Sequence, residues 1–104
     1  KLDLSNFFKK KDIFALIVNG DSMVDAHIAN GDMVLMEKIK DSFSLRNGDI
    51  VSALVPGLGT TLKYFFKKES KIHLQAANPA YEDIILNYDQ VVIQGKLLAV
   101  WRNI

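Results

Sequence analysis

Ser22 and Lys63 are the residues of this 104-residue chain whose types and settings best suit nucleophilic chemistry. Ser22 follows a Gly-Asp turn, where its hydroxyl would stand at the rim of a sheet beside backbone N–H groups. Lys63 lies in an otherwise apolar strand candidate and would share one face with Thr61 and Phe65. Apolar surroundings lower the pKa of an amine, and a neutral amine can take the proton of a serine hydroxyl. These settings predict a serine nucleophile with a lysine base.

Other assignments of these residue types are also open. Lys96 is a rival base, although no hydroxyl residue lies two positions before it. A lone lysine on a strand ordinarily extends its amine to solvent, and physics alone favours that for Lys63. Asp21, Asp25 and Asp32 could form an acid–base pair, but turn and capping roles account for all three carboxylates.

Metal and cofactor sites are not expected. His27 and His73 are far apart in the sequence, and neither has neighbouring ligands at metal-binding spacing. The segment Gly57-Leu58-Gly59 lacks the further glycine or lysine of a phosphate-binding loop. It therefore predicts a turn, and no cofactor is implied.

Basic residues raise a second class of function, a non-catalytic β-barrel that binds single-stranded nucleic acid. Lys67, Lys68 and Lys71 cluster beside Phe65 and Phe66, a composition typical of base-stacking platforms. A further basic run covers residues 9–11. The net charge of only +1 argues against a dedicated binding groove.

Composition sets the broad class of protein. The chain has 49% hydrophobic and 24% charged residues, which is typical of one globular domain. It contains no cysteine, and no apolar run approaches the ~18–20 residues that span a bilayer. We therefore expect a cytoplasmic domain without disulfides, zinc–thiolate sites or a membrane partner.

The elements that must position Ser22 and Lys63 are predicted to be strands. β-branched and aromatic residues recur in short runs between Gly, Asn, Asp and Pro turns. The pattern predicts a mostly β, small barrel-like domain of short, largely antiparallel strands with at most one short helical turn, near residues 22–29. The first run, 13–18, is continuously apolar and predicts a strand buried on both faces. The expected strands are 13–18, 33–39, 50–55, 61–66, 72–74 and 91–101.

Several short motifs, in this order, resemble the LexA/UmuD family of self-cleaving proteins. The first pair lies around Ser22, and the others follow along nearly the whole chain from about Leu4. The matching segments are Gly20-Asp21-Ser22-Met23-Val24-Asp25, Ile28-Ala29-Asn30-Gly31-Asp32, Arg46-Asn47-Gly48-Asp49-Ile50-Val51, Thr60-Thr61-Leu62-Lys63, Asn78-Pro79-Ala80-Tyr81 and the ending from Gln94 to Asn103.

The resemblance implies roles for particular residues. Ser22 would be the nucleophile and Lys63 its unprotonated general base. Backbone amides of Asp21 and Ser22 would form the oxyanion hole. Met23 and Thr61 would be supporting residues of the site, and Thr61 would help orient the Lys63 amine. Family members cut one bond of their own chain, usually Ala-Gly, in a loop upstream of this domain. No Ala-Gly bond occurs here, so the scissile segment is expected outside this sequence.

The resemblance also implies partners and a domain layout. Residues 1–12 would be an arm following the missing cleavage loop, and 13–104 the peptidase and dimerisation domain. A RecA–single-stranded DNA filament would stimulate cleavage, which relieves repression of DNA-damage (SOS) genes. Operator DNA would be bound only through a missing N-terminal domain, and the C-terminal domain would make the dimer. Independently of the resemblance, the strand 91–100 is apolar enough to pair or pack across a two-fold axis. The tail from Val100 to Asn103 favours a LexA-type repressor over UmuD-like polymerase accessory proteins and phage repressors.

Overall fold

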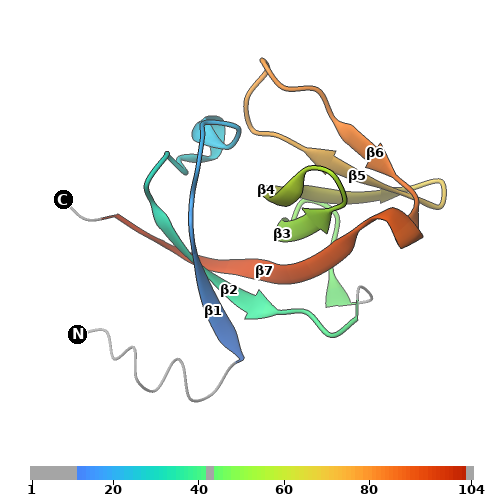
Figure 1. Cartoon of the computed structure of the whole chain (residues 1–104), viewed down its shortest axis with the longest axis horizontal. Coiled ribbons are helices and arrows are strands. Elements are labelled where there is room, and N and C mark those ends of the chain that lie inside the picture. Colours follow the sequence, from blue (N-terminus) through green and yellow to red (C-terminus); the bar gives the residue numbers. More distant parts are fainter. Residues whose placement is uncertain (1–11, 42–43, 103–104) are drawn as a thin grey trace.

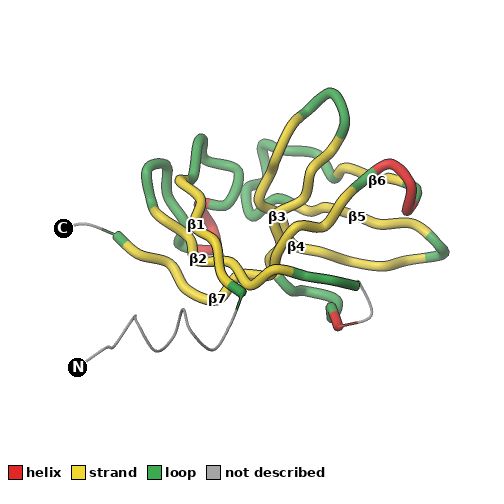
Figure 2. The backbone as a smooth tube through the Cα atoms, turned by 60° about the horizontal axis from the view of Figure 1, so that its bottom comes forward, coloured by secondary structure: helices red, strands yellow, loops and turns green. Residues whose placement is uncertain are grey.

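The described chain is built almost entirely of antiparallel strands. The computed structural model describes residues 12–41 and 44–102. Figure 1 shows the strands, and Figure 2 shows short helical turns between them. The elements are β1 (Ile13–Ile17), η1 (Val24–Ala26), β2 (Met33–Lys38), β3 (Ile50–Val55), β4 (Gly59–Lys68), β5 (Lys71–Gln75), β6 (Ile84–Leu86), η3 (Tyr88–Gln90) and β7 (Val92–Trp101).

The strands form one sheet in the order β1-β2-β7-β3-β4-β5-β6. All neighbouring pairs are antiparallel. Strand β7 joins the two halves, because its beginning pairs with β3 and its end pairs with β2 (Figure 1). The mostly antiparallel β prediction is confirmed. The sheet is not closed, since β1 and β6 stand at its two edges.

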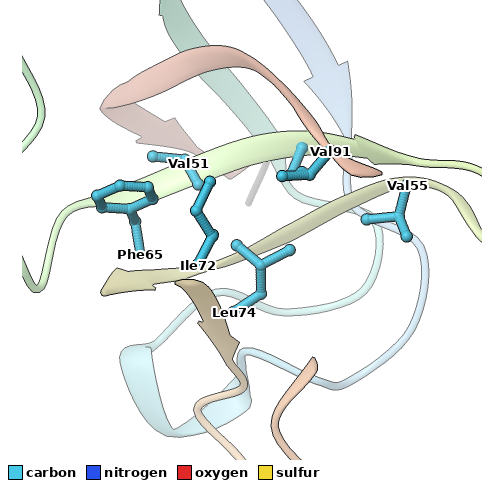
Figure 3. Close-up of a cluster of buried hydrophobic side chains, with 7 residues drawn as sticks. Val51, Val55, Phe65, Ile72, Leu74 and Val91 are labelled. Atoms are coloured by element: carbon cyan, nitrogen blue, oxygen red, sulfur yellow. The ribbon is translucent and has the colours of Figure 1, made fainter. Parts of the chain in front are cut away.

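Two hydrophobic clusters cover opposite faces of β4. Phe65 belongs to the first cluster, shown in Figure 3, whereas Leu62 and Tyr64 pack against the second. Because side chains alternate along a strand, one face of the middle of β4 is buried and the other is partly buried. The first cluster contains Val51, Ala53, Val55, Phe65, Ile72, Leu74 and Val91. The second contains Met23, Ile28, Val34, Met36 and Ala77.

The structure places a strand in each of the six predicted segments and adds β6, which the sequence did not suggest. The predicted helical turn is η1, and η3 was not predicted. The prediction that 13–18 is buried on both faces is wrong. Strand β1 is an edge strand, and Ile17 on its outer face is 67% exposed. Residues 1–11 of the predicted arm, including the basic run 9–11, lie outside the described residues.

The described part of the chain contains no helix of the length and apolarity that crossing a membrane requires.

Gly95 allows β1 to pack against the centre of the sheet. A Cβ atom at this position would lie 2.7 Å from Cε1 and Cζ of Phe14 and 3.1 Å from the carbonyl oxygen of Glu37. We predict that Gly95→Ala lowers the free energy of unfolding by about 1–3 kcal/mol, because the Phe14 ring must move. Urea denaturation measures this change.

A double-mutant cycle identifies the ring as the cause. In the Phe14→Leu background, Gly95→Ala should lower the free energy of unfolding clearly less than in the wild type, because a leucine side chain is shorter than the phenylalanine ring. Equal costs in the two backgrounds would contradict this account of the packing.

Candidate functional site

Ser22 lies in the turn between β1 and η1. Gly20 adopts a φ of +101°, a conformation that favours glycine, so the chain can reverse direction immediately before the serine. The N–H of Gly20 donates to Oδ1 of Asn30 at 2.8 Å. Two residues after the serine the 3-10 turn begins, with the N–H of Val24 donating to the carbonyl of Asp21 at 3.3 Å. Ser22 is therefore held between two ordered turns.

Lys63 lies in the buried middle of β4. The residue is 5% exposed, and its partner on β3, Val51, is fully buried. Its Nζ lies 3.0 Å from Oγ of Ser22 and donates to Oγ1 of Thr61 at 2.6 Å. The fold thus brings the amine of Lys63 within hydrogen-bond distance of both hydroxyls, those of Ser22 and Thr61.

Burial lowers the pKa of Lys63 below its ordinary value. An ammonium in this position loses hydration, and its two hydrogen-bond partners here are neutral hydroxyls. Neither partner supplies the negative charge that would hold the proton. The arrangement therefore makes the neutral form of this amine easier to reach than that of an exposed lysine.

A cleft of about 190 Å³ opens in front of Ser22. Residues at the end of β1 and at the start of β4 line it together with Ser22. Met23 is 2% exposed and anchors the turn in the second hydrophobic cluster. The lining residues are Leu16, Ile17, Val18, Asn19, Ser22, Met23, Val34, Thr60, Thr61 and Leu62.

The loop between β5 and β6 holds the serine turn from the side. Nδ2 of Asn78 donates to the carbonyl oxygen of Asp21 at 2.9 Å, and the Tyr81 hydroxyl donates to Oδ1 of Asp21 at 2.6 Å. The pKa of Tyr81 is raised by this bond to Asp21. The sequence marked the Asn-Pro-Ala-Tyr segment as a turn and a family element, but no local signal linked it to a residue 57 positions earlier.

Arg102, at the end of the described chain, forms a second long-range contact, with Asp32. Arg102 donates from Nε to Oδ1 of Asp32 at 2.9 Å and from Nη2 to Oδ2 at 2.8 Å. The hydrogen bond from Arg102 and the bond from the N–H of Ala29 lower the pKa of Asp32 to about 2. Asp32 is therefore a structural anion that fixes the turn containing Asn30.

The competing assignments are placed elsewhere by the structure. Lys96 forms an ion pair with Asp49 at 3.5 Å and has no part in the Ser22 cleft. Asp25 donates its N–H to the carbonyl of Ala77 as part of η1, a turn role. In residues 12–41 and 44–102, neither His27 nor His73 belongs to a group of three or more side chains that could hold a metal ion.

The base-stacking prediction is wrong for Phe65. This ring is 2% exposed and belongs to the first hydrophobic cluster, so it cannot receive a base. Lys68 lies over the ring of Phe66 at 5.6 Å from its centroid, and Lys67 over that of Tyr88 at 5.5 Å. The lysines cover the neighbouring rings instead of framing an open aromatic platform.

Comparison with known proteins agrees with the resemblance read from the motifs. The model of the Peptidase S24-like family matches residues 1–98. The LexA repressor of Ruegeria sp. (strain TM1040) is 48% identical over 90 residues, which is 86% of this chain and 36% of that relative. The chain thus spans about a third of the length of this curated relative, and the resemblance to a LexA C-terminal domain is confirmed. The chain belongs to the Peptidase S24-like family.

Proposed function

We propose that this chain is the self-cleaving domain of a LexA-type repressor, in which Ser22 attacks a peptide bond and Lys63 acts as the general base. The observation that carries the proposal is the 3.0 Å separation of Oγ and Nζ at a lysine that is 5% exposed. A buried amine whose partners in the described structure are neutral hydroxyls releases its proton more readily than an exposed lysine and can then act as a base.

The reaction follows from this geometry. Neutral Lys63 takes the Ser22 proton as Oγ forms a bond to the carbonyl carbon of the substrate. The N–H groups of Asp21 and Ser22 receive the oxyanion that develops. The C–N bond then breaks, and Lys63 returns the proton to the departing amine. Thr61 keeps the amine aimed at Ser22 through its 2.6 Å hydrogen bond. Water releases the acyl group from Oγ by the reverse sequence of proton transfers.

The proposed biological setting is based on membership of the family and on similarity to a LexA repressor. We infer that the scissile bond belongs to an upstream segment of the same polypeptide in the cytoplasm. A RecA–single-stranded DNA filament would stimulate its cleavage, and an N-terminal domain would bind operator DNA. Cleavage would then separate these domains and derepress DNA-damage genes. The similarity to a LexA repressor favours this setting over a polymerase accessory protein or a phage repressor.

Labelling with an alkyl fluorophosphonate tests the proposed pair without requiring the natural substrate. Oγ of Ser22 forms a bond to phosphorus, fluoride leaves, and the hydroxyl proton passes to Lys63. We predict that Ser22→Ala abolishes labelling of this site and that Lys63→Ala slows it by at least about 100-fold, the loss typical of a missing general base. Mass spectrometry of the labelled peptide measures the rate.

The pH dependence of the same labelling rate tests whether Lys63 acts as a base. Below the Lys63 pKa the neutral fraction of the amine rises about tenfold per pH unit, so the rate should rise with pH and level off above the lowered pKa. Lys96→Ala is the matched control and should keep both the rate and the profile. Undiminished labelling in Lys63→Ala would contradict the mechanism.

We also propose that two copies associate through the outer face of β1, β2 and β7. Ile17, Met33 and Trp101 lie opposite one another across these strands, and Ile17 and Trp101 are 67% and 44% exposed. In the next row inward, Leu35 is 3% exposed and lies between Ala15 and Ala99. Exposed apolar side chains that gather on one face of a sheet, as Ile17 and Trp101 do here, are typical of an interface between identical chains.

Sedimentation velocity tests this association. We predict a concentration-dependent dimer for the wild type and a monomer for Trp101→Lys, because an ammonium on this face is not compatible with a second copy packed there. Leu58→Lys, at a residue that is 65% exposed in the β3–β4 turn, is the control and should remain dimeric. A monomeric wild type at high concentration would overturn this proposal.

A further inference from the structure

The loop between β5 and β6 contacts the serine turn at three points. Beyond the two bonds to Asp21, the N–H of Asp25 donates to the carbonyl of Ala77 at 2.8 Å. Ala77 and Met23 also belong to the same hydrophobic cluster. These contacts bring residues 77–81 beside η1, which Figure 1 shows near the long connection from β5 to β6. The loop is therefore part of the framework around Ser22.

The bond from Asn78 acts on the peptide group that contains the Ser22 N–H. The carbonyl of Asp21 and the N–H of Ser22 belong to one planar trans peptide, in which the two bonds point in opposite directions. Fixing the carbonyl oxygen therefore fixes the direction of the N–H. The carbonyl oxygen of Asp21 accepts two hydrogen bonds. The bond from Nδ2 of Asn78 is 2.9 Å long and is shorter than the 3.3 Å bond from the N–H of Val24.

The Asn78 side chain is itself held in one orientation. Its Oδ1 accepts the N–H of Ala80 at 2.9 Å, and its backbone carbonyl accepts the N–H of Tyr81 at 3.1 Å. Because the oxygen end is occupied by a donor, the amide nitrogen is the end that faces Asp21. The donor is thus preorganised by its own turn.

We propose that Asn78 is a positioning residue that aims the N–H of Ser22 at the developing oxyanion. The inference rests on the proposed function, because it assigns a cause to the direction of one proposed oxyanion donor. Tyr81 serves as a comparison, since it binds the Asp21 carboxylate and does not touch the peptide group.

Three variants separate this role from a merely structural one. Asn78→Asp keeps an oxygen for the N–H of Ala80 but loses the donor to Asp21. Asn78→Ala loses both bonds, and Tyr81→Phe loses only the bond to the carboxylate. The pH profile of fluorophosphonate labelling at Ser22 is measured for each variant, together with its melting temperature.

We expect Asn78→Asp and Asn78→Ala to lower the plateau rate by roughly 10- to 100-fold, because misdirecting an oxyanion donor costs less than deleting it. The midpoint of the profile should stay at the wild-type pH in Asn78→Ala, since the Lys63 amine keeps its surroundings. Tyr81→Phe should stay within about threefold of the wild type, the scatter expected when no donor to the reacting atoms is disturbed.

Each other result overturns the inference. A wild-type plateau in Asn78→Asp with a low plateau in Asn78→Ala would show that only the loop turn matters. A shifted midpoint with an unchanged plateau in Asn78→Ala would place the effect on Lys63. Losses that follow the melting temperatures of all three variants would indicate general destabilisation. Failure of the proposed function is distinguishable, because Lys63→Ala would then label at Ser22 as fast as the wild type.

Discussion

The exclusion of water from the Lys63 amine is the constraint on which the rest of the site depends. A lysine on an ordinary strand would reach solvent and remain cationic. Here two hydrophobic clusters cover opposite faces of β4, and the residue is 5% exposed. Its amine contacts two hydroxyls and no carboxylate in the described structure. Burial therefore lowers the pKa of the group, and the fold turns a common surface residue into a candidate base.

The serine side depends on a different kind of support. Ser22 lies in a turn and not on a strand, so hydrogen bonds from distant segments must hold it. Asn30 holds Gly20, and Asn78 holds the carbonyl of Asp21. The turn that contains Asn30 is fixed in its own right by the ion pair between Asp32 and Arg102. A rigid strand and a clamped turn thus meet at one 3.0 Å contact.

The sequence allowed the strands, the antiparallel class and the pairing of Ser22 with Lys63 to be predicted, because periodicity, turn residues and the family motifs are local signals. It did not reveal that β1 is an edge strand, since a continuous apolar run carries no information on sheet order. The roles of Asn78 and Arg102 were missed for a related reason. Each acts on a residue far away in the sequence, and only the folded chain brings them together.

A direct titration of the Lys63 amine is the most decisive measurement. The ¹³Cε and ¹⁵Nζ chemical shifts of Lys63 are followed with pH in the folded chain, with the Lys63→Met variant used to assign the signal. The account predicts a midpoint below the ordinary value of 10.5, with the other lysines as internal references. A Lys63 signal that titrates at or above 10.5 would contradict it, because the amine would then carry its proton at neutral pH and could not serve as the base.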